Sequence, residues 1–107
     1  MPLPITTAIA EGILMLDGGM GTAVQGRALN VEGDYLGREN CVDLLVRGCP
    51  SLVHDIHASF LAAGSDAVET NTFGANRVVL GEFDEECAAW ARDLNAEAAS
   101  IARVACE

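Results

Sequence analysis

Two short segments of the chain have the pattern of β-strands. Residues 13–16 are all apolar and are followed at once by Asp17 and Gly18. A run without alternation that ends in turn residues is typical of a strand buried on both faces, as in a parallel sheet. Residues 66–73 predict a second strand, and positions 69–72 near its end are unusually polar.

Two longer segments have the spacing of amphipathic helices. The first is indicated over residues 51–63, and Gly64 follows in the position of a carboxyl-terminal cap. The apolar residues that recur in this segment are Leu52, Ile56, Phe60 and Ala63. The second helix is predicted from Asp84 onward, because acidic residues at its start complement the helix dipole. Its apolar face is formed by Trp90, Leu94, Ala98, Ile101 and Ala105.

The remaining segments are predicted to be a lead-in, a long irregular loop and a connection. Residues 1–11, which hold two prolines among small side chains, indicate a lead-in to a domain over residues 12–107. Residues 27–48 are punctuated by glycine, asparagine and aspartate, which predicts a long loop with room for one short helical turn. Loops of that length in compact domains are usually functional or disordered. Residues 74–81 are expected to be a connection between the second strand and the last helix.

The order of these elements predicts the α/β class. A strand, a loop, a helix, a second strand and a second helix follow one another along the chain, and such alternation favours a parallel sheet with right-handed crossovers. Two strands do not make a parallel sheet by themselves, because such sheets consist of several strands covered on both faces. We therefore expect these elements to open a larger structure.

Composition and charge exclude several classes of function. The chain has 107 residues, enough for one small domain, and a net charge of −10 from 16 acidic and 6 basic residues. This balance argues against a nucleic-acid surface, and the absence of lysine excludes Schiff-base chemistry within the chain. No apolar run approaches the roughly 20 residues that cross a membrane, and no secretory signal is recognisable. Four cysteines without CxxC spacing indicate buried thiols in a cytoplasmic protein.

The end of the first predicted strand carries candidate chemistry. Asp17 continues one face of that strand, and Gly18, Gly19 and Gly21 allow the backbone to approach a ligand closely. Backbone N–H groups can hold a carboxylate or a phosphate while Asp17 binds an ammonium group, and an α-amino acid offers both charges. The alternative is a tight turn in which Asp17 acts as a cap.

The end of the second predicted strand is the other candidate. Glu69 and Asn71 share one face of the strand, and Thr70 and Thr72 share the other. We expect one pair to line a site and the other to bond neighbouring strands, because buried polar groups need partners.

Two further groups of residues are not assigned a metal. His54 and His57 are spaced as a metal pair on a helix, but a solvated helix face is the favoured interpretation. The cysteines have no metal-ligand spacing.

These segments resemble the homocysteine S-methyltransferase family. Residues 13–22 and Gln25 are similar to the family's opening, and residues 34–37, 40–41 and 44–45 resemble a loop of its cobalamin-dependent methionine synthase branch. Residues 50–76 are similar to that branch in both type and spacing, and they include the segment from Glu69 to Asn76. The resemblance extends from Gly12 to the end of the chain.

The resemblance implies a fold and a set of site residues. The family fold is a (β/α)₈ TIM-type barrel of about 250 residues, so this chain is expected to hold its first two βα units. The residues implied to contribute to the homocysteine pocket are Asp17, Gly18, Gly19, Thr70 and Thr72. The family's zinc ligands follow a Gly-Cys-Cys pattern that this sequence lacks, so no catalytic residue and no metal ligand is assigned here. Cobalamin and methyltetrahydrofolate are implied through modules outside the chain.

Three functions remain open at this point. The first is the amino-terminal part of an enzyme that methylates the homocysteine thiol to form methionine. The second is the corresponding part of a betaine- or S-methylmethionine-dependent relative. The third is a stand-alone module that binds a small amino acid or pairs with another chain. In the first two cases the isolated chain is expected to be inactive and to need the rest of a barrel, or a partner chain, for a complete fold.

Overall fold

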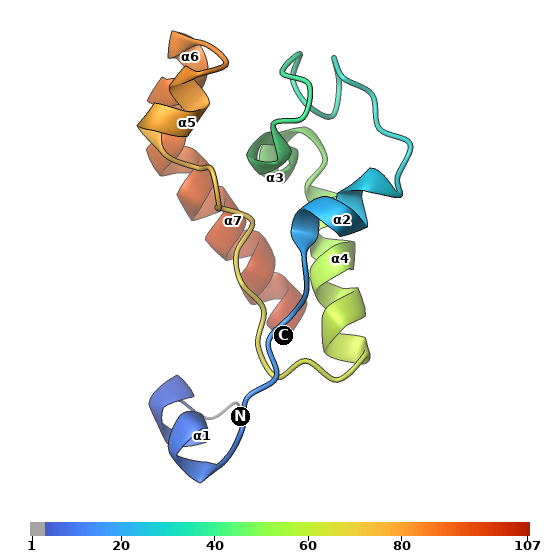
Figure 1. The fold of residues 1–107 in the computed structure, drawn as a ribbon, viewed down its shortest axis with the longest axis vertical. Helices are drawn as coiled ribbons and strands as arrows, with labels where there is room; N and C mark the ends of the chain where they lie inside the picture. The colour runs from blue at the N-terminus through green and yellow to red at the C-terminus, as the bar shows by residue number, and fades with distance from the viewer. Residues whose placement is uncertain (1–3) are drawn as a thin grey trace.

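The structure is a computed structural model that describes residues 4–107 and consists of helices joined by irregular segments (Figure 1). Its helical elements in chain order are α1 Ile5–Glu11, α2 Met20–Gln25, the 3₁₀ turn η1 Val42–Leu44, α3 Leu45–Gly48, α4 Pro50–Ala62, α5 Arg77–Gly81, α6 Glu85–Ala89 and α7 Ala91–Cys106. The longest helices, α4 and α7, pack against each other and against α3, whereas α1 lies at one end of the molecule without a buried residue. No helix among these residues is long and apolar enough to cross a membrane.

The predicted α/β class is wrong for this chain, because residues 4–107 contain no β-strand. The two segments predicted as strands do run side by side (Figure 1), and the Asp66 N–H donates to the Met15 carbonyl at 2.7 Å. The Met15 N–H, however, donates to the Asp66 carboxylate at 2.9 Å instead of to a backbone carbonyl. The predicted βα units of a barrel are therefore not formed in this structure.

The predicted burial of the first segment is also wrong. The side chain of Ile13 is 89 % exposed, and Met15 and Leu16 are more than half exposed. A parallel strand is stabilised by neighbours on both edges and by layers on both faces. Within the described residues, the hydrogen bonds to residues 13–17 come from residues 65–69, so the apolar run lacks the second strand partner that a central strand has.

Both predicted helices form, and the second is interrupted. The helix α4 covers Pro50–Ala62, and Gly64 follows it with a φ of +116°, which glycine adopts without steric cost. Asp84 caps α6 by accepting the Cys87 N–H at 2.7 Å, and Trp90 then separates α6 from α7. The predicted connection over residues 74–81 contains the short helix α5, which sequence spacing did not indicate.

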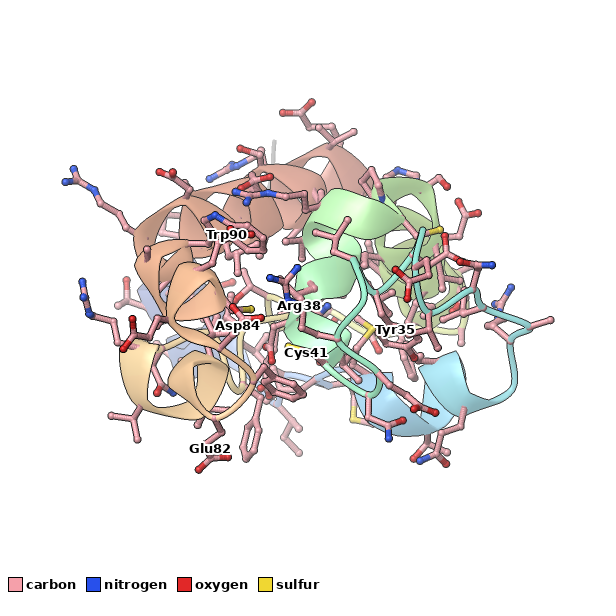
Figure 2. All side chains as sticks on the ribbon, turned by 90° about the horizontal axis from the view of Figure 1, so that it is seen from above. Tyr35, Arg38, Cys41, Glu82, Asp84 and Trp90 are labelled. Carbon is pink, nitrogen blue, oxygen red and sulfur yellow. The ribbon has the colours of Figure 1, made fainter. Side chains whose placement is uncertain are left out.

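The long loop before α3, through Arg38, and α3 itself, through Arg47, are held against Trp90 between α6 and α7. The guanidinium carbons of Arg38 and Arg47 lie 5.1 and 5.0 Å from the centre of the Trp90 ring. Arg38 also donates to Asp84 at 2.7 Å, and the labelled side chains of Arg38, Asp84 and Trp90 lie close together in Figure 2. These cation–π and charge-assisted contacts add to the packing of Leu29, Tyr35 and Leu36 against the core.

Candidate functional site

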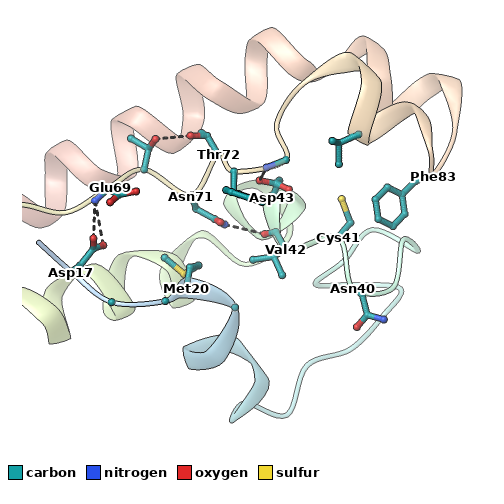
Figure 3. Close-up of a pocket in the computed structure, with 17 residues that line it drawn as sticks. Asp17, Met20, Asn40, Cys41, Val42, Asp43, Glu69, Asn71, Thr72 and Phe83 are labelled. Carbon is teal, nitrogen blue, oxygen red and sulfur yellow. Dashed lines mark hydrogen bonds between the residues drawn. The ribbon is translucent and has the colours of Figure 1, made fainter.

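All five residues predicted to bind a ligand line one cavity of about 630 Å³ (Figure 3). These residues are Asp17, Gly18, Gly19, Thr70 and Thr72. The cavity lies where the segment before α2, the segment before α5 and the loop before η1 meet. It is therefore built from parts of the chain that are far apart in sequence.

The Asp17 carboxylate connects two of these segments. Both of its oxygens lie 3.2 Å from the backbone N–H of Glu69, which is 52 residues away. The amino-terminal cap of α2 is Gly19, and no side chain caps that helix, so Asp17 joins two distant segments and does not cap α2. A carboxylate has about four acceptor positions, and one N–H leaves capacity for a ligand cation at the cavity wall.

Both faces of the polar segment contribute to the cavity. Glu69, Thr70, Asn71 and Thr72 all line it, whereas the sequence led us to expect one pair only. The Thr70 and Thr72 hydroxyl oxygens lie 2.7 Å apart and share a hydrogen bond. Asn71 is buried, and its amide donates to the Val42 carbonyl at 2.9 Å. The hydroxyls are thus held as a pair, and the neighbouring amide anchors the segment.

Sequence reasoning missed the contribution of η1 and of the loop that leads into it. Asn40, Cys41, Val42 and Asp43 line the cavity, together with apolar side chains from the segment around α5. Asn40 has a left-handed φ of 69°, a conformation that asparagine tolerates better than most residues. The available signal was Asp43 itself, because an acidic residue inside the apolar run from Cys41 to Val46 needs a buried partner. That partner is the Gly74 N–H, which donates to Asp43 at 3.0 Å.

Burial shifts the pKa values of Cys41 and Asp43, which line the cavity, and of the nearby Cys87. It raises the pKa of the Cys41 thiol to about 12, so this thiol stays protonated at neutral pH. Burial also raises the pKa of Cys87, and it raises the pKa of Asp43 while the Gly74 N–H acts in the opposite direction. Zinc is bound by cysteine thiolates, neutral histidines and carboxylates, and residues 4–107 gather no group of three or more such side chains. The donor set of these residues therefore does not fit zinc.

His57 is buried, which corrects the expectation that both histidines lie on a solvated helix face. It is fully buried on α4, and neither ring nitrogen has a hydrogen-bond partner among residues 4–107. His54, one turn earlier, is partly exposed and contacts Asp55. Burial lowers the pKa of His57, while the negative charge of Asp17 acts in the opposite direction. A neutral, unpartnered imidazole in the core is a cost to stability.

We expect His57→Leu to raise the free energy of unfolding by about 1 kcal/mol at pH 7, because an unpaired buried polar group costs about that much or more. The difference should widen as the pH falls below 6.5. In that range the unfolded wild-type chain takes up a proton that burial keeps off the folded one, so wild-type stability is lost. Urea unfolding at pH 7 and pH 5 measures both effects. His54→Leu serves as the exposed control, and a difference that does not widen would contradict this explanation.

Comparisons with known proteins point to one family. The sequence model described as homocysteine S-methyltransferase matches residues 14–107. A methionine synthase of Mycobacterium tuberculosis (strain ATCC 25618 / H37Rv) is 39 % identical to this chain over 95 residues, which are 89 % of this chain and 8 % of that protein. A methionine synthase of Mycobacterium leprae (strain TN) has the same identity over the same shares of the two chains. The chain thus spans a small part of the length of these relatives.

Proposed function

The chain belongs to the homocysteine S-methyltransferase family, a family of methyltransferases, and from this membership we propose that its cavity binds the amino-acid part of homocysteine. The observation that carries the proposal is the convergence of Asp17, Gly18, Gly19, Thr70 and Thr72 on one cavity. In the whole protein this binding would present the homocysteine sulfur for methylation to methionine.

The charges of the cavity suit the polar end of an α-amino acid. Asp17 and Glu69 lie together at one end of the cavity (Figure 3), where they would attract an ammonium group. The Thr70–Thr72 hydroxyl pair and the backbone at Gly18 and Gly19 offer donors for a carboxylate. One wall of the cavity can thus receive both charges of the ligand.

The opposite end of the cavity suits a short thiol side chain. Cys41 and Phe83 lie away from Asp17 in Figure 3, and Val42 and Val79 add apolar surface. The buried, protonated Cys41 thiol and the apolar side chains form an uncharged, polarisable surface that suits the methylene groups and sulfur of homocysteine. The separation of charged and apolar ends favours an amino acid with this polarity over a phosphate or a dicarboxylate.

The residues of this chain contribute binding and orientation to the proposed reaction. In methyl transfer to homocysteine a new S–CH₃ bond forms, the bond between the methyl group and its donor breaks, and the thiol proton is lost. Residues 4–107 gather no group of three or more metal-binding side chains, so we assign zinc no step here. Cobalamin and methyltetrahydrofolate, which the family resemblance implies through modules outside the chain, are assigned no step either. The same binding role would serve a betaine- or S-methylmethionine-dependent relative.

Calorimetric titration of L-homocysteine into the purified, reduced chain tests this proposal. We expect saturable binding that weakens strongly for 4-mercaptobutanoic acid, which lacks the ammonium group, and for 3-mercaptopropylamine, which lacks the carboxylate. Homoserine, in which a hydroxyl replaces the thiol, tests the apolar end. Absence of homocysteine binding would contradict the proposal, and a chain that dimerises without binding an amino acid would favour the chain-pairing alternative.

A further inference from the structure

Two hydrogen bonds tie the cavity's polar segment to the turn η1. The Asn71 amide donates to the Val42 carbonyl at 2.9 Å across 29 residues, and the Gly74 N–H donates to Asp43 Oδ1 at 3.0 Å across 31 residues. The side chains of Asn71 and Asp43 are among the few polar ones that are buried within residues 4–107. Figure 3 shows both between the Asp17 end and the Cys41 end of the cavity. We call these two contacts the Asn71–Asp43 clamp.

The clamp is closely packed at Gly74. A Cβ atom at this position would lie 2.7 Å from Asp43 Oδ2 and 3.0 Å from Val79 Cγ1, so a larger residue would push the carboxylate away. An unbonded polar group in such a place costs free energy, and the bond to Gly74 offsets that cost. The close approach leaves the segment little freedom to shift relative to η1.

The hydroxyl pair lies beside this anchored region. Thr72 stands between Asn71 and Gly74, the two positions that the clamp holds, and its hydroxyl is bonded to Thr70. A shift of Gly74 would therefore move Thr72 and separate or redirect the pair. Ligand groups must be held to within a fraction of an ångström for full affinity, so the clamp bears directly on binding.

We propose that Asp43, which lines the cavity, is a positioning residue of the amino-acid site and fixes the Thr70–Thr72 pair by accepting the Gly74 N–H. This inference rests on the proposed function. What the site needs at position 43 is an oxygen acceptor, not a negative charge. The substitution Asp43→Asn keeps such an oxygen, whereas Asp43→Ala removes it.

The test compares two variants with two measurements. In Asp43→Ala we expect faster hydrogen exchange of the Gly74 amide, measured by NMR without ligand, and an affinity for L-homocysteine roughly 3- to 10-fold weaker by calorimetry. In Asp43→Asn both the slow exchange and the affinity should be close to those of the wild type. Recovery in the asparagine variant distinguishes the lost acceptor from the lost charge.

Asn30→Ala is the matched control, because the Asn30 side chain also accepts one backbone N–H, that of Gly33, but does not line the cavity. It should lower the melting temperature and leave homocysteine affinity unchanged. If Asp43→Ala behaves in the same way, Asp43 only stabilises the fold and the inference is overturned. Equal weakening in Asp43→Ala and Asp43→Asn would also overturn it. If the wild-type chain binds no homocysteine, the proposed function itself fails, whereas a failure confined to the variants concerns Asp43 alone.

Discussion

Gly48→Ala is expected to lower the free energy of unfolding by about 3 kcal/mol, the upper end of the range for overpacked sites. A Cβ atom at Gly48 would overlap the Asp34 carbonyl oxygen and lie 2.6 Å from its carbon, so backbone, not a flexible side chain, would have to move. The loop would then lose its close approach to the end of α3, next to the buried Leu45 and Val46. For a domain of this size the melting temperature should fall by roughly 12–24 °C.

Thermal unfolding followed by circular dichroism measures this effect. Gly12→Ala is the control, because a Cβ atom at Gly12 meets no other atom within 4 Å and its backbone is extended. That variant should remain within about 0.5 kcal/mol of the wild type. If Gly48→Ala had the same melting temperature as Gly12→Ala, the contact between Asp34 and Gly48 would not constrain the loop. That contact would then not help to fix the position of η1 beside the cavity.

The helices could be predicted from the sequence because their signals are local. The apolar spacing of Leu52, Ile56 and Phe60 and the glycine at position 64 are contained within one segment, and α4 forms there. The break at Trp90 was not predicted, because Trp90 has the spacing of the apolar face of the second predicted helix. The break lies at a residue that is contacted by other segments. Arg38 of the preceding loop and Arg47 of α3 both stack on the Trp90 ring.

The strands could not be predicted reliably because a strand depends on partners that its own residues do not specify. Residues 13–16 have the composition of a central strand, but Ile13 is almost fully exposed in this chain. The carboxylates of Asp17 and Asp66 bind backbone N–H groups that a sheet would pair with carbonyls. An apolar run can therefore form a strand only where neighbouring segments pair with it and cover its faces.

The candidate site shows the same division between local and distant information. Asp17, Thr70 and Thr72 could be singled out because they are polar residues at the ends of predicted strands, where the fold gives them no evident structural role. The structure brings them to one cavity. The part contributed by Asn40 and Asp43 was missed, because the segment that meets this loop lies about 30 residues further along the chain. Periodicity contains no information on such pairings.

Asp17→Asn is expected to weaken L-homocysteine binding by roughly 10- to 150-fold. The substitution preserves the shape of the side chain and an oxygen that can accept the Glu69 N–H, but it removes the negative charge offered to the ligand ammonium. A charge-assisted hydrogen bond is typically worth about 1.5–3 kcal/mol, which corresponds to this range of affinity. Calorimetric titration of the wild-type and variant chains measures the difference.

The matched control is Asp55→Asn, which changes the net charge by the same amount at an exposed position on α4 outside the cavity. It should bind homocysteine as the wild type does, because exposed charges at a distance are screened by salt. Thermal stability of Asp17→Asn should stay near that of the wild type, since the bond to Glu69 survives. A variant with unchanged affinity would remove Asp17 from the ligand site and leave it as a tie between two segments. A variant with lower stability and unchanged affinity would lead to the same conclusion, because only the ligand distinguishes a binding carboxylate from a structural one.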